Sequence, residues 1–394
     1  MELMYLTFQE DAPLYVGVLR KIRWQARAFQ ALGYRVTYTL WQGSRYRFVT
    51  ESGTEEKDVG GGSGILHRFA AAAEDYLARR RFDVLYLRLD RMSFDILKIC
   101  RMARKNGAGR IIIEFPNYPY LANYIGSVRG VRPFRRHLTA LAKVLRAAAE
   151  DRIAALFLHR VADAAVLIGD HAGRVFGLKA VRMENGVDVG EFSPVPEKRG
   201  RNADEVVLIG VAGTLWWQAY DRVLAGMYAY RQASPGRKLR LRFLMVGGDA
   251  KEMPAFRAQI RRYGLEDDVE CPGFQTGQAL DELYARADVG VSSLGCYRRG
   301  LTSCSSLKAR EYCAKGLPFL YAYEDAQLAG VPFAVKLPND SSPVDMETVV
   351  RFVERCRSHP GLGEEERRFA REHYDWKNIM RQVLDFAGTG SKRT

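Results

Sequence analysis

The sequence predicts an α/β protein built from two successive domains, each with a parallel β-sheet. Its 394 residues are long for one domain and fit two domains of roughly 200 residues each. Short apolar runs alternate with amphipathic helical patterns along the whole chain, which is typical of parallel strands joined by crossover helices. The expected strands are 3–7, 35–40, 83–88, 110–114 and 164–168 in the first half, and 206–212, 241–246, 288–292 and 318–322 in the second.

A polar, proline-containing stretch between these two groups of strands predicts the domain boundary. Residues 192–200 read FSPVPEKRG and interrupt the alternation of strands and helices. We therefore expect an N-terminal domain over residues 1–194 and a C-terminal domain over residues 195–394.

Composition excludes several classes of protein. The sequence has no run of about 18 apolar residues, so no membrane span is expected, and its first residues lack the pattern of a signal peptide. The six cysteines form no Cys-x-x-Cys pair, which argues against a disulfide framework or a zinc site and favours a reducing compartment. We therefore expect a cytoplasmic protein.

The net charge of +14 is unevenly distributed. Residues 1–200 hold 32 Lys and Arg against 21 Asp and Glu, an excess of 11 positive charges, whereas residues 201–394 hold 28 against 25. A basic first half indicates an anionic partner, such as membrane lipid or a phosphorylated acceptor. Nucleic-acid binding is not expected, because no recognised nucleic-acid-binding motif accompanies the charge.

The pattern at residues 17–32 predicts an amphipathic helix directly after the first strand. Gly17 is expected to lie in the loop before this helix, where it would let a phosphate or a sugar approach the backbone closely. The alternative is an ordinary helix with a solvated basic face, and these residues do not separate the two interpretations.

The most informative segment in the second half is residues 303–318, which read SCSSLKAREYCAKGLP. Ser305 and Ser306 precede a predicted helix that ends near Gly316, so exposed N–H groups and hydroxyls offer a seat for an anion. Lys308 adds a charge in the first turn, and Glu311 projects from the same face, where it would accept ribose hydroxyls. The alternative is a capped surface helix in which Lys308 and Glu311 pair with each other.

A basic helical segment follows in the first domain. Residues 115–149 contain no Asp or Glu, and Pro133 suits a helix start. The cations Arg136, Lys143 and Arg146 lie away from a predicted apolar face. Such a helix would rest on anionic lipid or guide a lipid-pyrophosphate acceptor; the alternative is a core-packed helix with a solvated basic face. The predicted apolar face comprises Leu138, Leu141, Leu145, Ala148 and Leu156.

Taken in order, several segments resemble the retaining GT-B glycosyltransferases of family four. The resemblance covers nearly the whole chain, and Gly17 with its helix matches the family's first glycine loop. The other matching segments are MENGVD at 183–188, VAGTL at 211–215, GLEDDV at 264–269, PGF at 272–274, DELYARADV at 281–289, KAREYCAKGLP at 308–318 and Trp376.

The resemblance implies a GT-B fold, in which two Rossmann-like domains face a cleft and a closing helix at about 364–387 returns to the N-terminal domain. It also implies transfer of a sugar from a nucleotide-sugar donor in the C-terminal domain to a carbohydrate or lipid-linked acceptor in the N-terminal domain. Net retention, no cofactor and no metal are implied as well. Such enzymes serve cell-surface polysaccharide or glycolipid synthesis, at times as peripheral proteins of the inner membrane face.

The donor residues of the family carry over unevenly. Glu311 matches the second, ribose-binding glutamate of the family's E-x7-E motif, but Ser303 stands where the first is expected. Thr214 and Gln218 stand where the family has the Arg and Lys that neutralise the donor diphosphate. The sequence is closer to a variant branch with an S-S-L-K-x-R-E-Y pattern, in which Lys308 supplies this charge. The expected donor-binding residues are Gly17, Thr214, Gln218, Arg298, Ser305, Ser306, Leu307, Lys308 and Glu311, with Arg299 as a further cation.

Glu114 is the expected catalytic residue. It ends the predicted strand 110–114, where the family often places a catalytic-site histidine, and the alternative is a carboxylate that caps the next loop. Lys21, Arg136, Lys143 and Arg146 are expected to contact the acceptor or the membrane. A nucleotide-sugar epimerase or hydrolase of the same fold, or a donor-binding pseudoenzyme, are the alternative functions.

Overall fold

The computed structural model describes residues 1–12, 15–62, 64–116, 118, 134–168, 173–196, 204–213, 215–233 and 239–388, and omits the side chains of residues 134–140. Thr214 and the side chain of Arg136, both singled out by the sequence, lie outside the described part of the chain.

The chain folds into two compact units. Unit 1 comprises Met1–Glu184 and Trp376–Thr394, and unit 2 comprises Asn185–Asp375. The expected boundary at residue 194 therefore falls too late. The reason is that residues after Glu184 already bond within unit 2: the Asn185 N–H donates to Ser305 Oγ at 2.7 Å, and the Val195 N–H donates to the Lys315 carbonyl at 2.8 Å.

Unit 1 is built on a nine-stranded sheet with the order β4-β3-β2-β1-β5-β6-β7-β9-β8. Strands β2, β1, β5, β6, β7 and β9 are parallel, and antiparallel strands extend both edges. The strands are β1 (Glu2–Thr7), β2 (Arg35–Gln42), β3 (Arg45–Thr50), β4 (Gly53–Asp58), β5 (Val84–Arg88), β6 (Arg110–Phe115), β7 (Ala164–Leu167), β8 (Gly173–Val175) and β9 (Leu178–Arg182).

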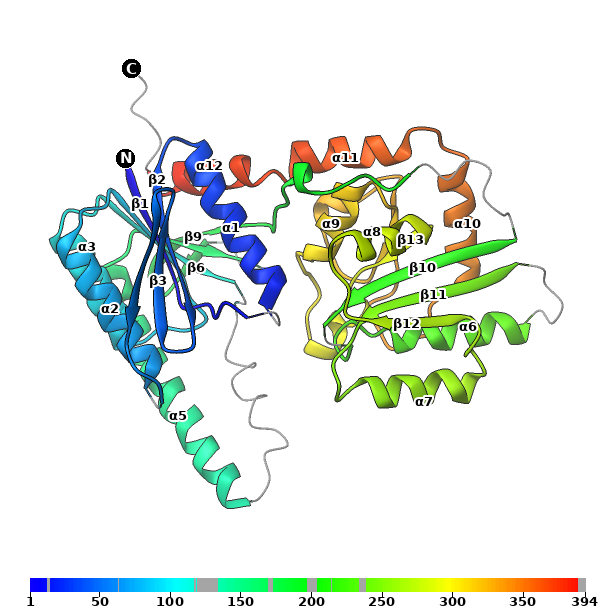
Figure 1. Ribbon diagram of the computed structural model, residues 1–394, viewed down its shortest axis with the longest axis horizontal. Helices are drawn as coiled ribbons and strands as arrows, with labels where there is room; N and C mark the ends of the chain where they lie inside the picture. The colour runs from blue at the N-terminus through cyan, green and yellow to red at the C-terminus, as the bar shows by residue number, and fades with distance from the viewer. Residues whose placement is uncertain are drawn as a thin grey trace. The chain divides into compact units, whose positions relative to one another are not determined.

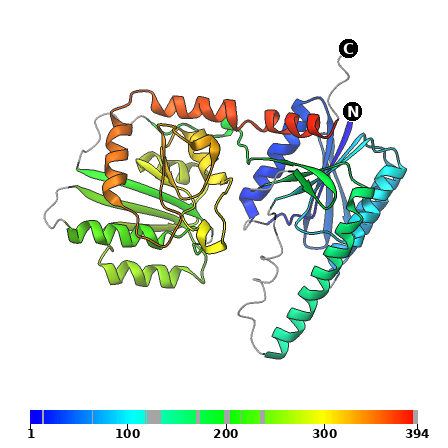
Figure 2. The same ribbon diagram turned by 180° about the vertical axis from the view of Figure 1, so that it is seen from behind.

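Helices cover both faces of this sheet (Figures 1 and 2). The described helices of unit 1 are α1 (Val16–Ala31), α2 (Ile65–Arg79), α3 (Phe94–Lys105), α5 (Phe134–Leu156) and α12 (Trp376–Phe386). Of these, α1 and α12 pack against each other on one face of the sheet, and α2, α3 and α5 lie on the opposite face. Among the described helices, none has the length and apolar character that a membrane span requires.

Unit 2 contains a six-stranded parallel sheet with the order β12-β11-β10-β13-β14-β15. Its strands are β10 (Glu205–Ala212), β11 (Arg240–Gly247), β12 (Val269–Gly273), β13 (Val289–Val291), β14 (Phe319–Tyr321) and β15 (Ala334–Lys336). Its helices are α6 (Asp221–Ala233), α7 (Met253–Tyr263), α8 (Gly277–Arg286), α9 (Leu307–Lys315), α10 (Met346–Arg357) and α11 (Leu362–His373). The predicted class, α/β with two parallel-sheet domains, is confirmed.

Two expectations need correction. The single closing helix at about 364–387 is two helices, α11 in unit 2 and α12 in unit 1. Gly17 lies in the first turn of α1 rather than in the loop before it, because α1 begins at Val16.

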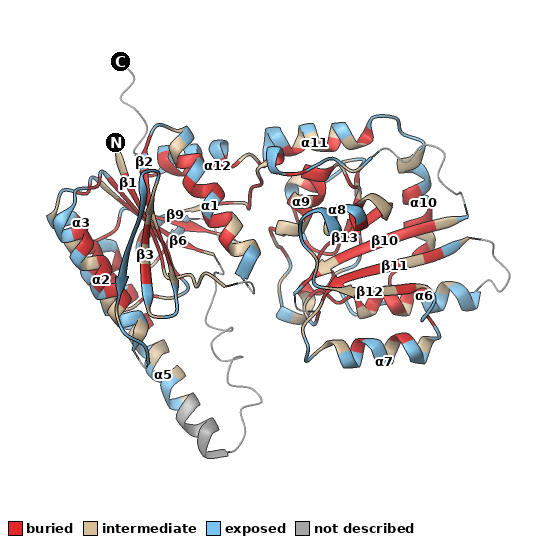
Figure 3. Cartoon of the chain, in the orientation of Figure 1, coloured by how far each residue is buried: buried red, intermediate tan, exposed pale blue. Residues whose placement is uncertain are grey.

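The predicted apolar face of α5 had two open interpretations, contact with lipid or packing on the core. Its described positions Leu145 and Leu156 are 59% and 68% exposed, so these two side chains do not pack on the core. Figure 3 shows exposed stretches along this helix.

Candidate functional site

The amino-terminal end of α9 is the centre of the candidate site in unit 2. The helix begins at Leu307, whose side chain is half-buried, and ends where Gly316 takes the left-handed conformation with φ 66°. Ser306 precedes the helix, but its side chain makes no capping hydrogen bond. Because the first N–H groups of a helix have no partner within it and carry positive partial charge, this end suits an anion.

A buried network holds the loop that leads into α9. Ser305 Oγ accepts hydrogen bonds from the Asn185 N–H at 2.7 Å and from Arg310 at 3.3 Å. The fully buried Arg310 guanidinium pairs with Asp325 at 2.8 Å and lies 3.8 Å from the ring centroid of Tyr374. Ser305, expected from the sequence as a donor contact, is therefore engaged in positioning this loop.

Ser306 is buried as well, and its hydroxyl oxygen accepts a hydrogen bond from Ser292 at 3.1 Å. Ser292 follows β13 directly, and its hydroxyl lies 3.3 Å from that of Tyr323. Ser303 is also buried. These contacts attach the start of α9 to the carboxyl end of the central strand β13, the edge where parallel α/β sheets bind ligands.

Lys308 lies half-buried in the first turn of α9, with its ammonium nitrogen 5.3 Å from the ring centroid of Trp217. Loss of hydration lowers the pKa of Lys308 to about 8, and the negative charge of Glu311 acts in the opposite direction. Lys308 and Glu311 are therefore close enough to interact, which is compatible with both sequence interpretations.

Trp217 is a residue that the sequence interpretation missed. Besides Lys308, the Arg299 guanidinium lies 5.7 Å from its ring centroid, so two cations share one half-buried indole. Its neighbour Trp216 is 56% exposed. The signal available in the sequence was the pair Trp216-Trp217 shortly after the predicted strand 206–212, because aromatic residues at the carboxyl end of a strand are placed to contact ligands.

Two further expected donor residues are engaged within unit 2. Arg298 donates to Asp221 at 2.5 Å and to the Trp216 carbonyl at 2.6 Å, so it ties its loop to the start of α6. Gln218 is buried and accepts a hydrogen bond from Ser293 at 2.9 Å. Gln218 carries no charge, and the Arg298 guanidinium is already bonded to Asp221 and to the Trp216 carbonyl.

Cys296 and Cys304 lie beside the same loop, and their thiols are hydrogen-bonded to each other. This bond lowers the pKa of Cys304, and the nearby cations Arg299, Arg310 and Lys308 act in the same direction against burial. The same bond raises the pKa of Cys296. The Cys304 thiol is therefore the more acidic of the two.

In unit 1, Glu114 is fully buried at the end of β6. One of its carboxylate oxygens lies 2.9 Å from the Lys21 ammonium, and the other accepts hydrogen bonds from Gln25 at 2.9 Å and Tyr86 at 2.7 Å. The Arg88 guanidinium lies 3.4 Å away. Burial raises the pKa of Glu114, but the charges of Lys21 and Arg88 and the bond from Tyr86 outweigh it, so the pKa lies below its ordinary value.

This arrangement bears on two expected roles. Lys21 is 3% exposed, so it cannot touch a membrane surface in this conformation, which corrects its expected position. Its burial lowers its pKa to about 8, although Glu114 opposes that shift. Both oxygens of Glu114 are engaged inside unit 1, and its catalytic role stays a prediction.

The other expected residues of unit 1 whose side chains the structure describes are accessible. Gly17 has open space around it, since a Cβ added there would meet nothing within 4 Å. Lys143 and Arg146 are exposed on α5. These positions leave room for a ligand without identifying one.

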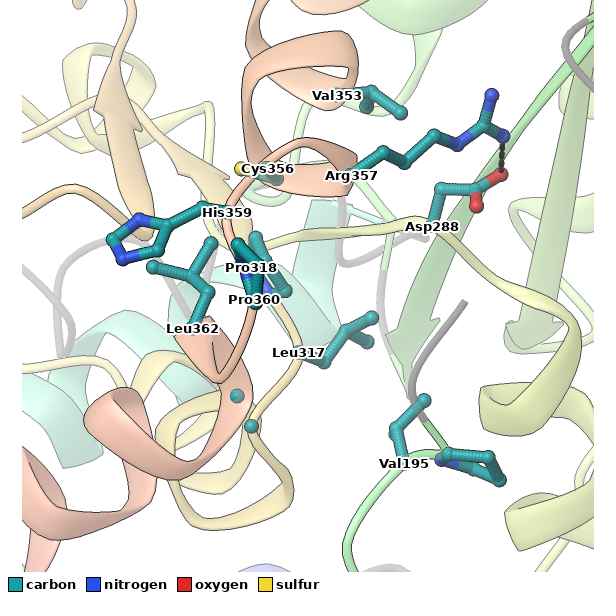
Figure 4. A pocket seen from close by; sticks show the side chains of 13 residues that line it. Val195, Asp288, Leu317, Pro318, Val353, Cys356, Arg357, His359, Pro360 and Leu362 are labelled. Atoms are coloured by element: carbon teal, nitrogen blue, oxygen red, sulfur yellow. Dashed lines mark ion pairs between the residues drawn. The ribbon is translucent and has the colours of Figure 1, made fainter. Parts of the chain in front are cut away.

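A small cavity of about 90 Å³ in unit 2 borders the carboxyl-terminal end of α9, since Gly316 and Leu317 line it. Figure 4 shows the side chains around this cavity. Its lining includes Asp288, which directly precedes β13, and Pro318, which directly precedes β14. Asp288 pairs there with Arg357 at 3.0 Å. The cavity therefore borders the amino-terminal edge of the parallel sheet, opposite the edge at which such sheets bind ligands.

Comparison with known proteins establishes the fold class of this arrangement. No protein-family model matches the sequence, and no curated protein matches it either. Solved structures do match along nearly the whole chain, and the similar structures are GT-B glycosyltransferases.

One similar structure is sucrose-phosphate synthase from Thermosynechococcus elongatus, with a TM-score of 0.62 at 14% identity over 99% of this chain and 100% of that one. Another is the catalytic domain of starch synthase IV from Arabidopsis thaliana bound to ADP and acarbose, with a TM-score of 0.64 at 10% identity over 99% of both chains. A third is a UDP-forming trehalose-phosphate synthase from Burkholderia xenovorans, with a TM-score of 0.55 at 12% identity over 100% and 99% of the two chains. This protein therefore has the GT-B fold of two Rossmann-like domains.

Proposed function

We propose that this protein is a glycosyltransferase that takes a sugar from a nucleotide-sugar donor bound at the amino-terminal end of α9. The observation that carries the proposal is the position of Lys308 in the first turn of that helix, beside Trp217, in a chain with the GT-B fold. The similar proteins are named as sugar transferases or synthases, and one of them binds ADP.

The chemistry of the donor follows from the helix. The free N–H groups of the first turn and the Lys308 ammonium would hold the diphosphate, because both place positive charge at one point. Glu311 lies one turn further along α9, where its carboxylate would accept the two ribose hydroxyls. Lys308 thus replaces the basic pair that is missing at Thr214 and Gln218.

The finer features of the proposal come from the resemblance to family four. We propose transfer with net retention, without a bound metal or cofactor, on the cytoplasmic side of the membrane and in cell-surface polysaccharide or glycolipid synthesis. Unit 1 would bind a carbohydrate or lipid-linked acceptor, for which the open space at Gly17 and the exposed cations of α5 provide room and charge. Glu114 stays the proposed catalytic residue.

One observation favours a second candidate, a donor-binding protein without transferase activity. Gln218 is buried and bonded to Ser293, so the position where the family carries a diphosphate-binding cation holds none. An epimerase or hydrolase of the same fold would share the donor site but would need no acceptor.

Incubation with a panel of nucleotide sugars and acceptors tests these functions. A transferase releases nucleoside diphosphate only when an acceptor is present and forms a glycosylated product. Release without acceptor indicates a hydrolase, and an epimerised sugar nucleotide indicates an epimerase. Tight donor binding without turnover on any acceptor supports the pseudoenzyme.

A further inference from the structure

The outer side of α5 in unit 1 carries large apolar side chains that face solvent. Leu145, Ile153 and Leu156 are 59%, 48% and 68% exposed, and their spacing places them on one side of the helix. The side of α5 that packs on unit 1 is formed instead by small or polar residues such as Ala154 and Asp151, both at most 2% exposed. The helix therefore has an apolar surface that the described chain does not cover.

A hollow of about 460 Å³ lies at the end of this apolar surface. It is formed by the last turns of α5 and the tight turn between β8 and β9, and its lining is largely apolar. The lining residues are Arg152, Ile153, Ala155, Leu156, His159, Phe176 and Gly177.

The wall made by Phe176 is held in a strained backbone conformation. Phe176 has φ 50°, in the left-handed region that non-glycine residues rarely adopt because Cβ crowds the backbone there. Hairpin turns of this kind usually carry Asn or Gly at that position. In this turn the position is occupied by an aromatic residue. Its ring packs edge-on against those of Phe115 and Tyr118, with centroid distances of 5.7 Å and 6.1 Å. The turn thus presents a fixed aromatic surface to the hollow.

Arg152 is the cation that lines the hollow, and the exposed charges of the neighbouring stretch of chain are mainly positive. The described carboxylates between residues 143 and 182 are used internally: Asp151 accepts from the Met92 N–H at 2.7 Å and Asp163 from Arg104 at 2.6 Å, while Glu150 lies 3.5 Å from Arg91. The cations of the same stretch are exposed to solvent, and Arg182 among them pairs with Glu184 at 2.6 Å. They are Lys143, Arg146, Arg152, Arg160, Arg174, Lys179 and Arg182.

We propose that this hollow receives the hydrocarbon chain of an anionic lipid, with the lipid head group bound by Arg152 and the neighbouring cations. An exposed apolar stripe bordered by cations is the pattern of helices that lie in an anionic membrane surface, and this charge favours a lipid over a protein partner. Ile153, Leu156 and Phe176 would contact the chain, and each buried methylene would strengthen binding roughly fourfold. This inference deepens the acceptor side of the proposed function, but its test uses no nucleotide sugar, so the two can fail separately.

The test measures sedimentation of the whole protein with vesicles of phosphatidylcholine, with and without phosphatidylglycerol. Wild type should bind the phosphatidylglycerol vesicles, and Leu156→Asn and Ile153→Asn should each weaken that binding about tenfold or more. Leu66→Asn is the matched control, because Leu66 is 49% exposed on α2 of the same unit and should leave binding unchanged. Thermal melts of all variants confirm folding, since the three side chains are exposed.

A second measurement distinguishes binding of the hydrocarbon chain from binding of the lipid head group. Titration with a monomeric short-chain phosphatidylglycerol should show binding that glycerol phosphate does not reproduce and that Leu156→Asn weakens. Equal binding of both compounds would place the affinity in the head group alone and overturn the proposal. Equal vesicle binding by wild type and both Asn variants would also overturn it, as would a wild-type dimer that Leu156→Asn converts to monomer, which would make the surface an interface between copies.

Discussion

The ammonium nitrogen of Lys21 on α1 lies 2.9 Å from a carboxylate oxygen of Glu114 on β6, and both side chains are buried within unit 1. The Lys21 ammonium also lies 5.6 Å from the ring centroid of Trp376, the first residue of α12. This pair joins the sheet of unit 1 to the face on which α1 and α12 pack. Its charges are compensated by each other and by Arg88, Gln25 and Tyr86.

Removing the charge of Glu114 should therefore destabilise unit 1. Glu114→Gln leaves Lys21 and Arg88 buried without their anion, and loss of one partner of a buried pair costs about 3–5 kcal/mol of unfolding free energy. The double variant Lys21→Met/Glu114→Gln should lose less unfolding free energy than the sum of the two single variants. The reason is that, with both charges of the pair removed, neither partner remains buried without the other. Urea denaturation measures the unfolding free energy of the two single variants and the double variant.

Lys57→Met is the control for that series, since the pair of Lys57 and Asp75 is exposed to solvent and should contribute little to stability. Turnover should be measured on the same proteins. If Glu114→Gln remains folded under assay conditions and its turnover stays within about twofold of wild type, Glu114 is structural and has no catalytic role.

The donor site predicts different effects for the two charged residues of α9. Glu311→Ala should weaken nucleotide binding by about 10- to 100-fold, because charge-assisted bonds to the ribose hydroxyls are lost. Lys308→Ala should weaken the binding of nucleoside diphosphates more than the binding of the bare nucleoside. Calorimetric titration with a series of nucleosides and diphosphates measures both.

Glu282→Ala on α8 is the control, because Glu282 is exposed in the same unit. If Lys308 and Glu311 serve only as a surface pair, both variants should bind nucleotides like wild type and lose roughly 0.2–0.5 kcal/mol of stability. That result would contradict the donor site at α9.

Diphosphate affinity should depend on pH through Lys308. Its pKa is lowered to about 8, and only the protonated form attracts phosphate, so affinity should be constant below that pH and fall as pH rises through it. Above pH 8, the affinity for diphosphates should fall by up to about tenfold per pH unit, and the affinity for the nucleoside should fall much less. Lys308→Arg should remove this dependence, because guanidinium stays protonated. A wild-type affinity that is flat between about pH 7 and 9 would exclude Lys308 as the phosphate contact.

The network behind α9 predicts a stability effect that reaches the donor site. Arg310→Met leaves the buried Asp325 carboxylate without its cation and should cost about 3–5 kcal/mol, whereas Ser305→Ala should cost about 1–3 kcal/mol. Arg310→Met/Asp325→Asn should recover part of the loss. Thermal unfolding and nucleotide titration of the same variants test this, and a fully stable Arg310→Met would show that the network is dispensable.

Short-range patterns account for most of the fold that could be predicted. The expected strands at 3–7, 110–114 and 206–212 correspond to β1, β6 and β10, because a short run of apolar residues in the sequence predicts a buried strand. Strand β4 could not be found in this way, since Gly53–Asp58 has no apolar side chain and all its residues are exposed. It forms because β3 pairs with it along its full length.

Local spacing was enough to predict two parallel-sheet domains, the positions of their main strands along the chain and the helix with Lys308 and Glu311, because apolar periodicity and helix-start residues act within one element. The order of the strands in each sheet and the burial of particular charges depend instead on how distant elements pack. Lys21 and Arg20 lie side by side in the sequence, yet Lys21 meets Glu114, which lies 93 residues further along the chain. Tertiary packing likewise places Trp217 beside Lys308 and leaves Leu145 and Leu156 exposed to solvent. Such partners are set by the packing of distant elements, and no local periodicity records them.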